Sequence, residues 1–374
     1  MIAVLVLLVA ACRVGDGATT TGQPTSTTTV GGTSPTQAGG IDALIEAARA
    51  EGTLNTIGLS RDYCNYGGVI EAFKSKYGLE INELGTDAGS ADGLGAIRRQ
   101  GPDEQAPDVV DIRLSLGPEA RSEGLLQQYK VTTWDSIPDH AKDPDGFWYG
   151  GYYGVMAFEV NSGAALSVPS DWSDLLDPQY RGMVALPGDP RVSNQAIFAV
   201  YAAALANGGS LDDAQPGLDY FAELNGVGNL GQIIAESASI AAGQTPVAIR
   251  WTYNALPNRD ATAGTAPIEV LIPRTGRLAG VYVQAISALA PHPNAARLWM
   301  EYLYSDEGQL GWLEGHCYPI RYDGLVAEDA IPPDLAAHLP ESSDPVFPTV
   351  EQLNAATELI TAGWDSVVGG GLGG

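Results

Sequence analysis

Three apolar, strand-like segments, separated by helical patterns and polar loops, constrain the fold of this chain most strongly. The strand-like segments are residues 54–59, 79–84 and 107–114. Apolar residues at helical spacing occupy 69–77 and 94–99, between successive strands. A strand, a helix and a second strand in this order form a β-α-β unit, in which the two strands run parallel. The sequence therefore predicts an α/β fold whose first sheet is parallel.

Two later segments rich in strand-forming residues, 153–161 and 281–289, interrupt this alternation. We interpret each as a strand that crosses between two lobes. A chain that crosses twice builds two discontinuous lobes with a hinge between them, a layout that suits closure over a ligand. The predicted units are lobe 1 (41–158 with 285–345), lobe 2 (159–284), a C-terminal helix (346–369) and a glycine-rich tail (370–374).

The N-terminal end has the pattern of an export and anchoring segment. Residues 1–11 are apolar over about the length of a signal-peptide core and are too short to span a bilayer. The run ends in Val-Ala-Ala before Cys12, which resembles a bacterial lipobox, although no Lys or Arg precedes it. We therefore expect a signal peptide over 1–12 with lipidation at Cys12. Residues 13–40 are almost all Thr, Ser, Gly, Pro or Gln and predict a disordered tether.

The charge balance limits the classes of partner. The chain has 19 basic and 45 acidic residues, a formal net charge of −26 at pH 7. Phosphate backbones are contacted mainly by Lys and Arg, so this composition argues against a nucleic-acid partner. A solvated acidic surface accounts for the charge without naming a ligand.

Two longer motifs resemble a known family. They are DWSDLLDPQYRGMVALPGDP at 171–190 and PHPNAARLWMEYLYSDEGQ at 291–309. Both are similar to segments of the extracytoplasmic solute-binding proteins of ABC importers, in the group that takes up ferric iron, polyamines, thiamine or phosphonates. Residues 123–127 (EGLLQ) and 319–321 (PIR) add weaker matches. The matches are spread over about residues 40–369, nearly the whole mature chain.

The resemblance implies a type II periplasmic-binding-protein-like fold, in which each lobe is a mainly parallel sheet flanked by helices. The two crossing strands would act as the hinge. The implied function is that of a substrate-binding component, which captures a small charged solute outside the membrane and delivers it to an ABC permease. It also implies an extracytoplasmic, lipid-anchored protein, expected as a monomer, without a cofactor, a resident metal or catalytic residues.

The loops that follow the predicted strands form the expected ligand site, because ligands of open α/β sheets bind at the carboxyl ends of the strands. The candidate ligand-binding residues are Ser60, Arg61, Asp62, Tyr63, Ser90, Ser115, Tyr152, Tyr153, Arg191, Ser193, Arg250, Trp251 and Tyr253.

A cationic solute such as a polyamine is favoured by the many aromatic residues near these loops. Trp251 and Tyr153 would flank its methylene chain. The carboxylates available to pair with its ammonium groups are Asp62, Asp87, Asp92 and Glu159.

Three arginines, Arg61, Arg191 and Arg250, favour an anionic solute instead, because a buried cation repels an ammonium group. With the candidate serine hydroxyls they suit a phosphate, phosphonate or carboxylate, and an aminophosphonate would use both kinds of charge. Ferric iron is a third alternative, with Tyr152 and Tyr153 as oxygen donors. The iron-binding members, however, usually carry their adjacent tyrosines later in the chain.

Two cysteines fall in the predicted lobe 1. Cys64 lies in the first loop after a strand, and Cys317 follows the helix that returns to this lobe. We expect them either to form one disulfide, which the oxidising side of a membrane permits, or to remain a pair of buried thiols.

Other function classes have less support. The chain has no HExxH, GxSxG or GxxxxGK[ST] motif, so we predict that it is not an enzyme. Two alternatives stay open. One is a secreted glycoside hydrolase, whose paired carboxylates leave no motif. The other is a surface module that binds a protein partner with the same fold.

Overall fold

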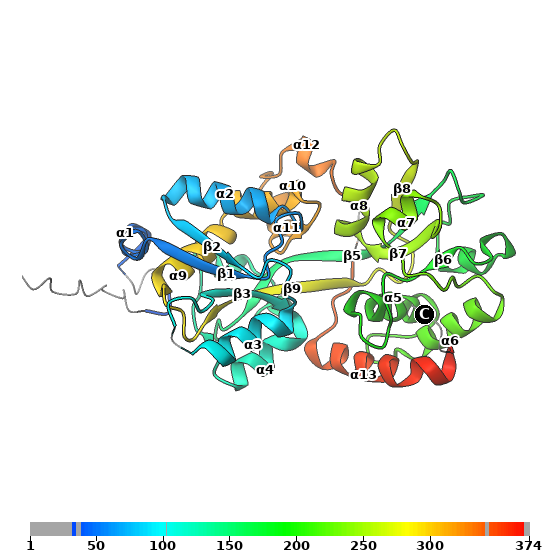
Figure 1. Cartoon of the computed structure of the whole chain (residues 1–374), viewed down its shortest axis with the longest axis horizontal. Helices are drawn as coiled ribbons and strands as arrows, with labels where there is room; N and C mark the ends of the chain where they lie inside the picture. The colour runs from blue at the N-terminus through cyan, green and yellow to red at the C-terminus, as the bar shows by residue number, and fades with distance from the viewer. Residues whose placement is uncertain (1–31, 35–38, 102, 341–343, 370–374) are drawn as a thin grey trace, which may run out of the picture.

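The computed structural model describes residues 32–34, 39–101, 103–340 and 344–369. Figure 1 shows two lobes joined by two long strands, β5 (Tyr149–Asn161) and β9 (Ala279–Ser287). Cys12 and most of the predicted tether lie outside the described residues. Within the described part of the chain, no helix combines the length and the apolar character needed to cross a bilayer.

Lobe 1 contains a mixed sheet with the strand order β2-β1-β3-β9-β5. Strand β1 (Thr53–Ile57) pairs in parallel with β2 (Glu80–Leu84) and with β3 (Val109–Arg113), as the β-α-β pattern predicts. Strand β9 returns from lobe 2 and runs antiparallel to β3 and β5. Two short strands, β4 (Leu126–Gln127) and β10 (Tyr318–Pro319), pair with β9 and β5 respectively.

Helices flank both faces of this sheet (Figure 1). The first helix ends at Gly52, whose φ of 76° is left-handed and whose N–H bonds to the Ala48 carbonyl at 2.9 Å. The helices of lobe 1 are α1 (Ile41–Glu51), α2 (Tyr66–Tyr77), α3 (Ser90–Gln100), α4 (Gly117–Ser122), α9 (Pro293–Leu303), α10 (Asp306–Glu314), α11 (Tyr322–Ala327) and α12 (Pro333–Ala336).

Lobe 2 is built on the far half of β5. Strand β5 pairs antiparallel with β7 (Val247–Trp251) and β8 (Ile268–Leu271), and β6 (Val184–Ala185) runs parallel to β7. The helices of lobe 2 are α5 (Asn194–Ala206), α6 (Gln215–Gly226), α7 (Ser237–Ala241) and α8 (Thr252–Ala261). The last helix, α13 (Val350–Val367), packs against α5 and α6. Short 3-10 helices occupy Leu114–Leu116 (η1), Trp134–Ser136 (η2), Asp139–Ala141 (η3), Trp172–Leu176 (η4) and Pro178–Tyr180 (η5).

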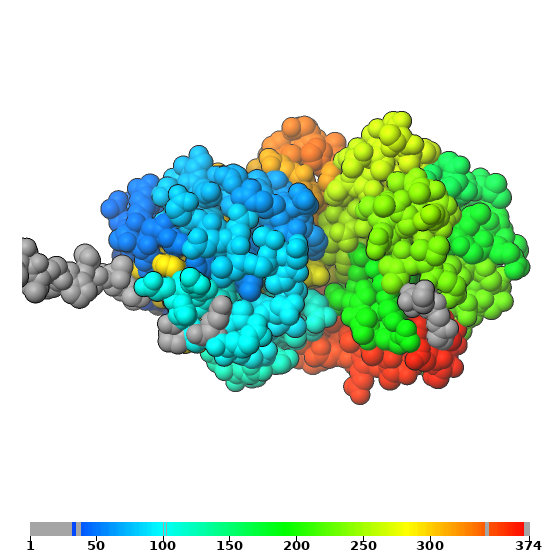
Figure 2. All heavy atoms as spheres, viewed as in Figure 1, coloured from blue at the N-terminus to red at the C-terminus, as the bar shows by residue number. Residues whose placement is uncertain are grey.

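The hinge is the best-buried part of the molecule. Every residue of β5 is buried, and one continuous hydrophobic cluster includes side chains from both lobes. Figure 2 shows the two lobes as separate masses that meet along a seam. Because neighbouring residues of a strand point to opposite faces, Tyr152 and Tyr153 of β5 face different sides of this junction.

Candidate functional site

A cavity of about 500 Å³ lies at the carboxyl ends of β1, β2 and β3, beside the two crossing strands. We call it the front cavity. Its position agrees with the general rule that ligands of α/β sheets bind at these strand ends. The residues that line it are Gly58, Ser60, Tyr63, Thr86, Asp87, Ala88, Gly89, Ser90, Ala91, Asp92, Asp111, Arg113, Tyr152 and Tyr282.

Four tyrosines from four parts of the chain meet at or beside this cavity, and we call them the tyrosine cluster. Tyr63 follows β1, Tyr152 and Tyr282 belong to the crossing strands, and Tyr253 lies in α8 of lobe 2. The rings of Tyr63 and Tyr253 are 5.2 Å apart between centroids, and those of Tyr152 and Tyr282 are stacked at 5.7 Å. Tyr253 therefore brings lobe 2 into contact with the loop of lobe 1 that carries Tyr63.

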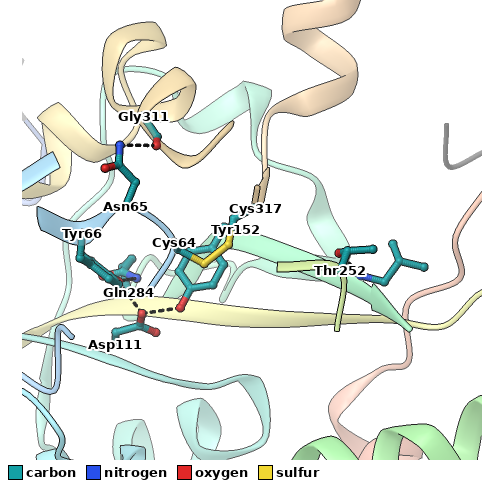
Figure 3. The surroundings of a disulfide bond; sticks show 10 residues. Cys64, Asn65, Tyr66, Asp111, Tyr152, Thr252, Gln284, Gly311 and Cys317 are labelled. Carbon is teal, nitrogen blue, oxygen red and sulfur yellow. Dashed lines mark hydrogen bonds between the residues drawn. A yellow bond between two sulfur atoms is a disulfide. The ribbon is translucent and has the colours of Figure 1, made fainter. Parts of the chain in front are cut away.

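Asp111 of β3 lies beside Tyr152 of the tyrosine cluster and beside Tyr66 (Figure 3). Its Oδ2 accepts a hydrogen bond from the hydroxyl of Tyr152 at 2.8 Å and another from the hydroxyl of Tyr66. The amide of Gln284 donates to the Tyr66 oxygen at 3.0 Å. The other carboxylate oxygen, Oδ1, is buried and has no hydrogen-bond partner among the described residues. Burial raises the pKa of Asp111 to about 6, because no cation contacts it.

Burial also controls the protonation of the phenols. It raises the pKa of Tyr63, Tyr152 and Tyr253 well above the ordinary value, and the negative charge of Asp111 acts in the same direction. The phenols are therefore neutral at pH 7 while nothing is bound. Any ligand that needs phenolate oxygens must displace their protons.

A disulfide holds the loop that carries Tyr63. Cys64 and Cys317 are bonded, with Cα atoms 5.6 Å apart and a sequence separation of 253 (Figure 3). Cys64 and Asn65 both have left-handed backbone conformations, at φ 47° and 60°. The Asn65 amide donates to the Gly311 carbonyl at 3.1 Å. These contacts fix the tight turn between Tyr63 and Tyr66.

The opposite wall of the front cavity is the start of α3. Residues 86–91 line the cavity, and the first backbone N–H groups of a helix favour negative charge. The carboxylate of Asp92 caps this helix, because it accepts a hydrogen bond at 3.2 Å from the N–H of Gly89, the residue just before α3. The Ser90 hydroxyl accepts a hydrogen bond from the Arg113 N–H at 3.1 Å, and the Arg113 side chain lines the cavity. Arg113 and the start of α3 favour an anionic group at this wall, whereas the carboxylates of Asp87 and Asp92 favour a cation.

The structure brings some of the candidate residues to the front cavity. Tyr253 contacts Tyr63, as described above. The candidates and candidate carboxylates that line the cavity directly are Ser60, Tyr63, Asp87, Ser90, Asp92 and Tyr152.

Arg61 and Asp62 do not line it. The Arg61 guanidinium pairs with Glu71 at 2.7 Å and with Glu83 at 2.9 Å on the outer surface. Asp62 is exposed. The expectation that these two side chains face a ligand is corrected, because the turn after β1 directs Tyr63 inward and its two predecessors outward.

Arg191 and Ser193 also have other partners. The Arg191 Nε bonds to Asp189 at 2.8 Å, and its Nη1 lies 3.1 Å from Asp365 of the C-terminal helix. The Ser193 hydroxyl accepts a hydrogen bond from the Ala196 N–H at 3.4 Å and caps α5, as its place before an apolar helix predicts. Neither residue lines the front cavity.

Arg250 and Trp251 are structural in lobe 2. The Arg250 guanidinium pairs with Glu159 at 2.7 Å, and Glu159 is fully buried. Trp251 is 2% exposed and packs against Phe198 and Tyr253. The predicted ligand roles of Arg250, Trp251 and Glu159 are therefore corrected, because these side chains fill the core behind the cavity.

Tyr153 and Ser115 complete the candidate set. The Tyr153 ring points away from Tyr152 and stacks on Tyr318 at 5.0 Å. Ser115 lies in η1, beyond the end of β3, and does not line the front cavity.

The sequence reasoning missed Asp111, Tyr282 and Arg113. Asp111 lies within residues 107–114, which the sequence predicts only as a strand. An acid in the middle of an apolar strand is a signal that could have found it, since a buried carboxylate needs a partner or a ligand. In the described part of the chain, no three His, Cys, Asp or Glu side chains converge as a metal cluster. Any metal held in the front cavity would therefore depend on phenol oxygens.

Comparison with known proteins places the chain in a family. Residues 104–352, more than half of the chain, match the model of the bacterial extracellular solute-binding proteins. Iron uptake protein A2 of Synechocystis sp. is 28% identical over 335 residues, which cover 85% of this chain and 90% of that protein.

Solved structures show the same fold at lower identity. The periplasmic binding protein AfuA from Actinobacillus pleuropneumoniae, with fructose-6-phosphate bound, has a TM-score of 0.63 at 20% identity and covers 84% of this chain and 98% of its own. The Trichodesmium protein IdiA (FutA), with iron and citrate, has a TM-score of 0.60 at 20% identity and covers 85% and 99%. These likenesses confirm the predicted fold class, the two-lobe periplasmic-binding-protein-like fold of type II. This chain therefore belongs to the bacterial extracellular solute-binding proteins.

Proposed function

We propose that the solute is a ferric ion, held by phenol oxygens of the tyrosine cluster and by Asp111. The observation that carries this proposal is the meeting of four tyrosines with a carboxylate whose Oδ1 has no partner among the described residues. Hard cations take oxygen ligands, and tyrosine is a known ligand of ferric iron in haem proteins. A trivalent ion would neutralise Asp111 and lower the pKa of each phenol that it contacts.

A polyamine fits the front cavity less well. Glu159, the deepest of the carboxylates considered for it, is neutralised by Arg250. Trp251, considered as a stacking surface, is buried in lobe 2. The relatives support a metal: the Synechocystis protein is named for iron uptake, and the Trichodesmium structure contains iron and citrate.

The test is a titration of the full chain with ferric citrate, followed by visible absorbance. Phenolate-to-iron charge transfer colours such a complex, so a new band is expected that saturates at one iron per chain. Tyr152→Phe removes one oxygen ligand and is expected to weaken iron binding by about tenfold or more. Tyr153→Phe is the matched control, because it makes the same change on the next residue, which faces the other side of β5.

Proton release provides a second readout. Because the phenols are neutral before binding, each one that ligates iron releases a proton, and the affinity is expected to fall as the pH falls. The iron proposal fails if no charge-transfer band forms, or if Tyr152→Phe and Tyr153→Phe bind equally well.

A phosphate-bearing or phosphonate solute is the second candidate. The observation that favours it is that the start of α3 and the Arg113 side chain both line the front cavity. AfuA, a structural neighbour, has fructose-6-phosphate bound. Calorimetry with fructose 6-phosphate in the absence of iron tests this candidate. Binding that is lost in Arg113→Gln, without any ferric band in the wild type, would favour the phosphate solute over iron.

The remaining parts of the function concern delivery. We infer that the protein is a monomer, anchored through a lipid on Cys12, and that it passes its cargo to an ABC permease. The lipobox-like sequence before Cys12 supports the anchor. Cell fractionation of the wild type and Cys12→Ser tests it: the variant should move from the membrane to the soluble fraction, and an unchanged distribution would refute the anchor.

A further inference from the structure

A second cavity, of about 360 Å³, lies on the opposite side of β5 from the tyrosine cluster. We call it the rear cavity. Tyr152 lines the front cavity, and Tyr153, the next residue of the strand, lines the rear one. The residues of the rear cavity that carry the argument are His140, Tyr153, Tyr322, Asp323, Asp344 and Phe347.

Aromatic rings form its walls. The rings of Tyr153 and Phe347 meet nearly at right angles, with centroids 5.1 Å apart. His140 lies 4.5 Å from Phe347 between ring centroids. Tyr318 stacks on Tyr153 and contacts the edge of Tyr322 at 5.4 Å, so it holds these two walls in place. The faces of aromatic rings attract cations.

The charges at the rear cavity are negative. Asp323 and Asp344 line it and are exposed to solvent, and among its described lining residues none is a lysine or an arginine. Burial lowers the pKa of His140, so its ring is neutral at pH 7. The lysine closest to it in sequence, Lys142, is turned to Asp139 at 3.1 Å and to the Ile137 carbonyl at 2.7 Å.

The Tyr153 side chain also borders the rear cavity and is 7% exposed. Asp323 and Tyr322 are the groups close enough to influence its ionisation from this side.

We propose that the rear cavity is a binding site for a small organic ammonium ion. The aromatic walls would receive the cationic head through cation–π contacts, and Asp323 and Asp344 would pair with its charge at the mouth. A cavity of this size accommodates a ligand such as choline. The site is separate from the front cavity because β5 lies between them.

The experiment is calorimetric titration of the full chain with choline chloride, compared with dimethylbutanol, its uncharged carbon isostere. Choline is expected to bind and the isostere to bind much more weakly. Asp323→Asn is expected to weaken choline binding by roughly fivefold or more, and Tyr322→Leu by a similar factor. Glu328→Gln is the matched control, because it removes an exposed acid just after the same helix but outside the cavity.

A third variant locates the binding. Asp111→Asn changes only the front cavity and should leave the choline affinity unchanged. Circular dichroism melts identify any variant that fails to fold, and the exposed Asp323→Asn change keeps the test decisive if Tyr322→Leu is lost. The proposal is overturned if choline does not bind, if the isostere binds as well, or if Asp111→Asn rather than Asp323→Asn abolishes binding.

Discussion

Asp111 in lobe 1 and Glu159 in lobe 2 are both carboxylates on strands that face the interior, and they have opposite environments. Glu159 is fully buried and saturated, since Arg250 pairs with one oxygen and the Asn258 amide donates to the other. Asp111 accepts only from the phenols of Tyr66 and Tyr152 and keeps Oδ1 free of described partners. A buried carboxylate that is paired with a cation is neutralised within the fold, whereas one without a cation is available to a cationic ligand.

The largest effect should come from breaking the saturated pair. Arg250→Met leaves Glu159 buried without its cation, and the expected loss in the free energy of unfolding is about 3 to 5 kcal/mol. Urea unfolding at pH 7 measures it. Arg191→Met, which removes an arginine from a surface pair, is the control and should unfold close to the wild type.

The folded Arg250→Met variant should still bind the solute of the front cavity, because Arg250 does not line that cavity. A small stability change together with lost binding would reverse the comparison and return Arg250 to the ligand site.

The unsaturated carboxylate should make the ligand-free protein less stable as the pH rises. The pKa of Asp111 is raised to about 6, so between pH 4 and 6 the folded state holds a proton that the unfolded state has released. The contribution of Asp111 to the free energy of unfolding is therefore greatest below the ordinary aspartate pKa and falls until the pH passes about 6. The expected contribution is about 1 to 2 kcal/mol, because the cavity gives the carboxylate some contact with water.

Asp111→Asn isolates this contribution, since other carboxylates titrate in both proteins. The variant should gain stability relative to the wild type between pH 4 and pH 8 in chemical unfolding. Parallel pH profiles for the two proteins would show that Asp111 is neutralised in the ligand-free state after all.

The smallest expected effect concerns the hydrogen bonds that the phenols of Tyr66 and Tyr152 donate to the Asp111 carboxylate. Tyr66→Phe removes one hydrogen bond to the carboxylate, and this bond favours its charged form. The pKa of Asp111 should therefore rise further above 6, and stability should fall by about 1 kcal/mol. Carboxyl NMR titration of the ligand-free protein measures the pKa directly. A pKa that falls or stays unchanged would mean that Tyr152 alone controls the carboxylate.

The fold was largely predictable. The β-α-β start, the two crossing strands, the end of α1 at Gly52 and the cap of α5 by Ser193 all follow from local patterns, and the structure has each of them. These features depend on hydrophobic periodicity and on backbone hydrogen bonds within a few residues, which a sequence shows directly.

The site was predictable only as a set of loops. The candidates Tyr63 and Tyr152 line the front cavity, whereas Arg61, two positions before Tyr63, faces the solvent. Which residue of a loop faces inward depends on the turn, and here the left-handed Cys64 and its disulfide decide it. The predicted ligand role of Arg250 is wrong because a sequence does not show that the neighbouring strand places Glu159 two positions from Ala157, the register partner of Arg250, within reach of its guanidinium.

The sequence by itself determined the class of molecule: an acidic α/β chain, with strands that cross twice between two lobes and with the motifs of a solute-binding protein. The tertiary structure alone decided which charges are neutralised inside the fold and which remain for a ligand. The physical reason is that pairing depends on side chains far apart in the chain, such as Tyr66 with Asp111 and Glu159 with Arg250. Their distance and shared burial, which set the electrostatic free energy, exist only after the sheets have formed.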